Sequence, residues 1–184
     1  MAIKTETIPC NFIGDFKVGD NLVFNTDLLR KIMEENETST LNKMIVLQLG
    51  SIVEAALSQI IYRAQNYTKE GVPNIPESVR LQIESEEVDT FYKIIEAMKT
   101  YKILDSLGED IYEQLNRLRK YRNKIHIQKD LKIEGASRDD RAAFSDEVRN
   151  WALALNIKIM KFLSEKMPRP KELHVFGGQL IFPT

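Results

Sequence analysis

Apolar residues recur at helical spacing along most of the chain and predict a bundle of four to five main helices. A long helix is expected over residues 40–65, where apolar positions cover a wide arc of the helix surface. Further helices are expected over residues 27–36, 86–104, 109–127 and 139–166. An apolar arc as wide as that of residues 40–65 indicates a helix at the centre of the bundle.

Both ends of the chain carry short apolar runs that predict β-structure. Residues 1–25 have the pattern of an extended segment with one or two short strands, at 11–13 and 21–24. Near the C-terminus, residues 173–176 and 179–182 are joined by Gly177-Gly178, which is the pattern of a β-hairpin. Because an isolated hairpin is marginally stable in water, we expect it to pack on the bundle, or to pair with the N-terminal strand or a second subunit.

These elements predict one mainly all-α domain, consisting of an up-and-down helical bundle over residues 26–167 between an extended N-terminal segment and a C-terminal hairpin over 168–184. The length of 184 residues fits a single domain. A content of 43% hydrophobic and 29% charged residues is typical of folded proteins. A loop rich in glycine and proline is expected over residues 66–78, with a short helix after Glu77.

The few cysteines and histidines limit the chemistry. Cys10 is the only cysteine, so the chain forms no internal disulfide and no cysteine metal cluster. His126 and His174 show no paired spacing with other metal ligands, so neither a metal nor a cofactor is expected, and His174 is interpreted as structural. The first residues lack the apolar run of a signal peptide, and residues 43–62 contain too many polar groups for a membrane span. We therefore expect a cytoplasmic protein.

The charge is distributed unevenly. The chain has a net charge of −1, but residues 117–132 contain seven basic residues and one acid, a local charge of +6 that leaves −7 on the rest. Such a basic segment is a candidate site for a polyanion. A solvated helix face, or a surface that binds an acidic protein, has the same pattern.

The basic segment also contains a set of groups suited to phosphodiester chemistry. On a continuous helix, Arg119, Arg122, Asn123 and His126 stand at offsets 0, 3, 4 and 7 and share one face, while Ile111, Leu115, Leu118 and Ile125 form the buried stripe. Arginine binds phosphate with two parallel hydrogen bonds, and histidine transfers protons near neutral pH. These groups predict metal-free cleavage of RNA, in which His126 takes the 2′-hydroxyl proton. The product of that cleavage ends in a 2′,3′-cyclic phosphate. The alternative is a structural role, since His and Arg side chains also stabilise a helix C-terminus.

Residues 118–126 resemble the signature of HEPN domains (higher eukaryotes and prokaryotes nucleotide-binding). In that family an arginine, usually followed by a polar residue, precedes a histidine by four to six residues near the end of a helix. Arg122-Asn123 is similar to this pair, although three residues separate Arg122 from His126, whereas six separate Arg119 from His126. The resemblance covers residues 40–166 and includes an acid, Glu54, within the long apolar helix.

The resemblance implies an all-α bundle that acts as a metal-independent endoribonuclease or RNA-binding protein, and as a toxin or defence component. It implies a homodimer in which Arg and His of both subunits line one cleft, Glu54 supports the arginine, and an antitoxin or other protein is a partner. Further RNA contacts are expected from the neighbouring basic residues and from a tyrosine that would stack on a base, namely Arg117, Lys120, Lys124 and Tyr121. The alternative is a catalytically silent HEPN-like module for protein assembly.

Overall fold

The computed structural model describes residues 4–67, 75–127, 133, 135–173 and 175–184. Its elements follow one another as β1 (Thr5–Pro9), α1 (Phe16–Glu34), α2 (Asn42–Asn66), α3 (Glu77–Glu84), α4 (Phe91–Thr100), the 3₁₀ helix η1 (Asp105–Leu107), α5 (Ile111–Arg122), α6 (Asp140–Ala143), α7 (Asp146–Lys166) and β2 (Gln179–Pro183). The protein is a helical bundle with one small sheet, which confirms the mainly all-α class.

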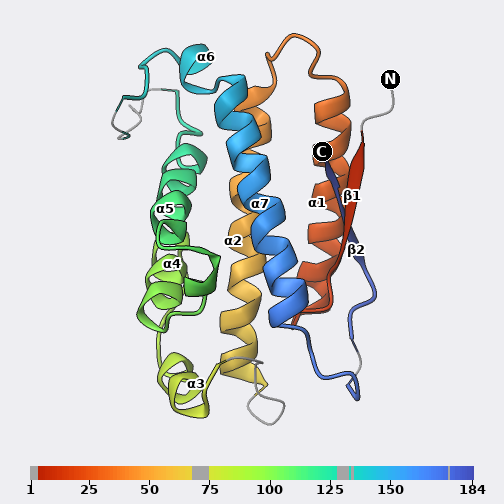
Figure 1. The fold of residues 1–184 in the computed structure, drawn as a ribbon, viewed down its shortest axis with the longest axis vertical. Coiled ribbons are helices and arrows are strands. Elements are labelled where there is room, and N and C mark those ends of the chain that lie inside the picture. The colour runs from red at the N-terminus through yellow and green to blue at the C-terminus, as the bar shows by residue number, and fades with distance from the viewer. Residues whose placement is uncertain (1–3, 68–74, 128–132, 134, 174) are drawn as a thin grey trace.

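Helix α2 lies at the centre of the bundle, as its wide apolar arc predicts. In Figure 1 it runs beside α7, with α1 on one side and α4 and α5 on the other. Helices α2 and α7 point in the same direction: near their N-termini the Asn42 amide donates to Asp146 at 2.9 Å. Near their C-termini the buried Arg63 guanidinium donates to the Met167 carbonyl at 2.6 Å. These polar contacts fix the register of the two longest helices.

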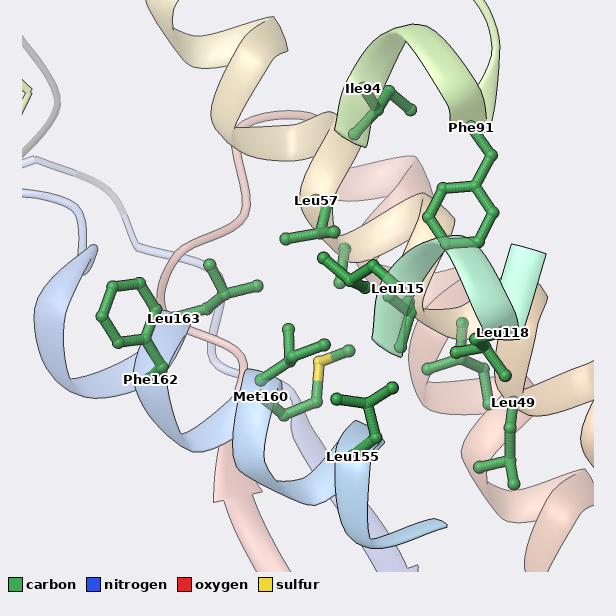
Figure 2. Close-up of a cluster of buried hydrophobic side chains, with 14 of the residues drawn as sticks. Leu49, Leu57, Phe91, Ile94, Leu115, Leu118, Leu155, Met160, Phe162 and Leu163 are labelled. Atoms are coloured by element: carbon green, nitrogen blue, oxygen red, sulfur yellow. The ribbon is translucent and has the colours of Figure 1, made fainter. Parts of the chain in front are cut away.

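The core lies where α2, α4, α5 and α7 meet. Figure 2 shows buried side chains from all four helices converging there, including Leu57, Phe91, Leu115 and Leu155. Burying an aliphatic or aromatic side chain of this size contributes about 1.5–3 kcal/mol, so these contacts hold α5 against α2. The orientation of α5 in turn decides where its basic residues lie.

The two ends of the chain form one antiparallel sheet, in which Thr5 pairs with Pro183 and Pro9 with Gln179. Pairing with the N-terminal strand was one of three expectations for the C-terminal segment, and it is confirmed. The predicted hairpin is wrong, because residues 175–178 form no strand. Phe176 instead packs against Phe16 of α1, with ring centroids 5.6 Å apart.

Helix α1 starts at Phe16, well before the start at Asp27 that a Thr26 cap predicts. The Asp15 side chain accepts a hydrogen bond from the Lys17 N–H at 2.9 Å and so provides the N-cap. Residues 21–24, predicted as a strand, are helical, because Leu22 and Leu29 bury the same face of the helix. Thr26 lies inside α1, where its hydroxyl donates to the Val23 carbonyl at 2.9 Å.

Three predicted helices are shorter or divided in the structure. The helix expected over residues 86–104 starts at Phe91, after the Thr90 N-cap, and ends at Thr100. The one expected over 139–166 is divided into α6 and α7, because Ser145 caps a new helix by accepting from the Val148 N–H at 3.4 Å. The helix expected over 109–127 ends at Arg122. Ile125 therefore leaves the predicted buried stripe and is exposed.

Among the described residues, α2 is the one helix long and apolar enough to be considered for crossing a membrane. Its mean hydropathy reaches 1.7, but 61% of the apolar window is buried inside the protein. That burial is the property of a core helix, in agreement with its prediction from sequence.

Candidate functional site

An open cavity of about 440 Å³ lies where the C-terminal end of α5 meets α2 and the N-terminus of α4. It brings together four residues singled out from the sequence, namely Glu54, Arg119, Arg122 and Asn123. The segment around the start of α4 completes the lining with Asp89, Thr90, Phe91 and Tyr92. The cavity therefore contains two guanidiniums, an amide and two carboxylates from three separate elements.

Arg122 and Glu54 form an ion pair on one side of this cavity, through Nη2 and Oε2. The Arg122 side chain is 37% exposed and that of Glu54 is 21% exposed, so the pair is partly shielded from water. Arg122 also donates through Nη1 to the Asn123 side chain at 3.2 Å. Hydrogen bonds to two different partners orient the planar guanidinium at the cavity.

The Glu54 carboxyl lies in a mixed environment. Burial raises its pKa more than the Arg122 charge and a hydrogen bond with the Phe91 backbone lower it, so the pKa lies above the ordinary range. Phe91 is the first residue of α4, where a free N–H favours a negative charge. Glu54 thus links α2, α4 and α5 at a single carboxylate.

Arg119 supplies the second guanidinium of the cavity. Its Nε donates to the Asn116 side chain at 3.1 Å, and its guanidinium lies 5.2 Å from the centroid of the Tyr92 ring. A guanidinium held against an aromatic face keeps its charge while its edges remain open to an acceptor. Arg119 and Arg122 are therefore both held by neighbours and both line the same open space.

The prediction of one continuous helix that carries His126 on the face of Arg119 and Arg122 is wrong, because α5 ends at Arg122. Residues 123–126 form turns and a bend after the helix, where the Lys124 N–H donates to the Tyr121 carbonyl at 3.0 Å. The offset of seven residues places two side chains together only if the helix continues. His126 is exposed and is not part of the cavity lining.

Two of the predicted RNA contacts do not fit their surroundings. The Tyr121 ring is only 2% exposed and packs against Phe144, with centroids 5.4 Å apart, so it is closed to stacking on a base. Lys124 is 5% exposed, pairs with Asp140 at 3.3 Å and donates to the Ile127 carbonyl at 3.1 Å. Its ammonium group is therefore bound by groups of the protein itself and is not exposed for an RNA phosphate.

Arg117 and Lys120 are exposed on α5, as an RNA contact requires. The Arg117 guanidinium lies 4.4 Å from the centroid of the Trp151 ring of α7, a cation–π contact that leaves its outer edge in water. Residues 128–132 of the basic segment, and His174, lie outside the described residues.

The residues around the N-terminus of α4 were not predicted as part of the site. Thr90 followed by apolar residues is a sequence signal for an N-cap. A helix expected to start at residue 86 instead places Thr90 inside the helix, where it would not be a cap. Asp89 contacts Lys93 at 3.0 Å, and this side-chain hydrogen bond lowers the Asp89 pKa. That this segment lies against Arg119 and Glu54 depends on the packing of α4 on α5 and α2.

Within the described part of the chain, no three or more His, Cys, Asp or Glu side chains are grouped to hold a metal ion. Comparison with protein-family models, with curated proteins and with solved structures finds no match for this chain. The resemblance to HEPN domains therefore rests on residues 118–126 and Glu54 alone.

Proposed function

We propose that this protein is a HEPN-like RNA-binding protein and metal-independent endoribonuclease, in which the cavity between α2, α4 and α5 binds a phosphate of the RNA backbone. The observation that carries this proposal is the presence of Arg119 and Arg122 in the lining of one open cavity, each held by neighbouring side chains. Guanidiniums held in place recognise phosphate oxygens at little cost in side-chain entropy. Arg117 and Lys120, exposed on α5, would extend the contact along the RNA.

Cleavage also needs a group that takes the 2′-hydroxyl proton, and His126 is the candidate. It lies outside the cavity of its own chain, in the turn after α5. In a symmetric dimer, the two copies of this turn would lie near the two-fold axis, and His126 of each copy would face the cavity of the other. Attack of the 2′-oxygen on phosphorus would break the bond to the 5′-oxygen, which would leave as a hydroxyl after taking a proton from water. Arg122 would stabilise the negative charge on the non-bridging oxygens in the transition state.

Exposed apolar side chains next to His126 support such a dimer. Ile125 is 64% exposed and Ile127 is 83% exposed, on either side of the histidine. Two large aliphatic residues in one short turn are costly to leave in water and are suited to an interface. In this proposal the protein acts in the cytoplasm as a toxin or defence component, and a protein partner such as an antitoxin would cover the same surface.

A catalytically silent HEPN-like assembly module is the second candidate. Two observations favour it: Glu54 neutralises Arg122, and His126 lies outside the cavity. The exposed Ile125 and Ile127 would then bind a partner chain without any chemistry at the cavity.

Single-turnover incubation with a mixed-sequence RNA, with a chelator present, separates the two candidates. We expect fragments that end in a 2′,3′-cyclic phosphate, and RNA binding that weakens with salt at a log–log slope of about −0.7 for each phosphate contacted. Cleavage that vanishes with the chelator would contradict the metal-free mechanism. If the protein neither binds nor cleaves RNA under any condition tested, the assembly module is favoured.

A further inference from the structure

Helix α5 crosses α2 at Gly50, in closer contact than any other residue would permit. A Cβ atom at Gly50 would lie 2.6 Å from the Cβ of Arg122 and 2.9 Å from its Cγ. Real Cβ atoms essentially never approach other heavy atoms within 3.0 Å, and here the nearest atoms belong to the stem of the side chain rather than to its flexible end. The missing side chain of Gly50 is therefore the space that the Arg122 stem occupies.

Glu54, one turn further along α2, binds the guanidinium of the same arginine. Residues 50 and 54 lie four apart and so share one face of the helix. Two positions of α2 thus hold the two ends of the Arg122 side chain: Gly50 admits the stem, and Glu54 pairs with the charge. Asn123 binds the other terminal nitrogen of the guanidinium, with its Oδ1 accepting from Nη1 at 3.2 Å.

We propose that Gly50 is a positioning residue of the candidate site, which sets the distance between α2 and α5 at which Arg122 reaches both Glu54 and the cavity. A side chain at position 50 would push the Arg122 stem outward and take its guanidinium away from Glu54. The inference rests on the proposed function for the role of Arg122 toward RNA. The placement of Arg122 is tested without RNA.

Replacement of a glycine within a helix normally stabilises a protein, because glycine loses more conformational freedom than alanine on folding. Overpacking at a close contact has the opposite effect. Gly50→Ala should therefore lower the Tm, by about 5 °C for a chain of this size. Ser51→Ala is the matched control, because it raises helix propensity at the next, exposed position of α2 and should leave the Tm unchanged or slightly higher.

The contact is isolated by repeating Gly50→Ala in an Arg122→Gly background. That background removes both the Cβ and the Cγ of Arg122, and the nearest remaining atom, its Cα, lies at 3.7 Å, an ordinary contact distance. Gly50→Ala should then raise the Tm, whereas in an Arg122→Ala background, which keeps the Cβ, it should still lower it. Should Gly50→Ala alone fail to fold, recovery of the fold by Arg122→Gly would support the proposal, and no recovery would overturn it.

Titration of the Glu54 carboxyl, followed by carbon-13 NMR, distinguishes positioning from general packing. Arg122 lowers the Glu54 pKa, so displacement of its guanidinium by Gly50→Ala should raise that pKa, as removal of the guanidinium by Arg122→Gly should. In the Arg122→Gly background, Gly50→Ala should cause no further change. If Gly50→Ala leaves the Glu54 titration unchanged, or raises the Tm as Ser51→Ala does, the proposal is wrong.

These two measurements are independent of the proposed function. If the parent protein binds a mixed-sequence RNA, Gly50→Ala should weaken that binding to the level of Arg122→Gly. If the parent binds none, the proposed function fails, while the Tm and titration results still decide whether Gly50 positions Arg122.

Discussion

Glu54 of α2 and Arg122 of α5, 68 residues apart in sequence, form an ion pair at the edge of the open cavity. A pair of this kind adds little to stability when it is partly exposed to water. Its main consequence is orientation, since the carboxylate also meets the N-terminal end of α4 through the Phe91 backbone. The cavity, the arginine and the start of α4 are therefore linked through one acid.

Glu54→Gln should change how stability depends on pH. Burial raises the Glu54 pKa, so the folded state keeps this proton to a higher pH than the unfolded chain does. As pH rises from the unfolded pKa through the raised folded pKa, the parent should lose stability relative to Glu54→Gln. Urea unfolding of both proteins between about pH 4 and about pH 7 measures the difference.

The control for this titration is Asp89→Asn, for which the sign reverses. The hydrogen bond with Lys93 lowers the Asp89 pKa, so the parent should gain stability relative to Asp89→Asn as pH rises from the lowered folded pKa to the unfolded pKa, below about pH 4. Between about pH 4 and about pH 7 this difference should stay constant. If the stability difference between parent and variant changes with pH in the same direction for Glu54→Gln and Asp89→Asn, the environment described for Glu54 is wrong.

Arg122→Lys should separate attraction of RNA from stabilisation of the transition state. Lysine keeps the charge but lacks the planar fork, so binding should persist while kcat falls about 10²-fold. Single-turnover cleavage and binding at two salt concentrations give the two quantities. Lys120→Gln is the control, since this exposed residue lies outside the cavity lining and should weaken binding without a separate loss of kcat. A Lys variant as active as the parent would show that Arg122 contributes only charge.

His126→Ala should abolish cleavage and leave the fold intact. The side chain is exposed in the turn after α5, so its removal should change the free energy of unfolding by no more than about 0.5 kcal/mol. Thermal unfolding, measured together with RNA cleavage, tests both parts. A much lower Tm would indicate that this histidine serves the structure.

Asp140→Asn should destabilise the turn after α5. Asp140 accepts from Lys43 at 2.6 Å and pairs with the buried Lys124, and these contacts lower its pKa. Loss of the carboxylate should cost about 1–2 kcal/mol, measured by urea unfolding at neutral pH. The difference should disappear as pH falls through the lowered Asp140 pKa, since the acid of the parent is then neutral as well.

The double variant Asp140→Asn with Lys124→Met tests the origin of this loss. Because it also removes the buried cation, it should recover part of the stability lost by Asp140→Asn alone. If the losses simply add, Lys124 does not depend on Asp140.

Light scattering at micromolar concentration should give the mass of two chains. Ile127→Asp should reduce it to the mass of one chain and leave that chain folded, because the side chain is exposed within a single chain. Leu81→Asp, at another exposed apolar position on α3, is the control that should leave the dimer intact. A single-chain mass for the parent would exclude a site completed by a second copy.

The central helices could be predicted from the sequence because their signal is local. The repeated spacing of apolar residues in α2 and α7 arises from the 3.6-residue period of the helix, which any segment carries in itself. The same period correctly placed Arg119, Arg122 and Asn123 on one surface near the end of α5. The place of Glu54 in the site was suggested only by the resemblance to HEPN domains, because residue spacing within one helix gives no information about a neighbouring helix.

Tertiary structure decided the rest, because helix ends and cross-chain pairs depend on partners that are distant in sequence. Lys124 pairs with Asp140 just beyond the end of α5, and Arg122 lines the cavity whereas His126 does not. The start of α4 joins the cavity only through packing on α2 and α5, and β2 pairs with β1 from the other end of the chain. The sequence by itself determined which groups could perform chemistry, and the packing of α5 on Gly50 determined which of them meet.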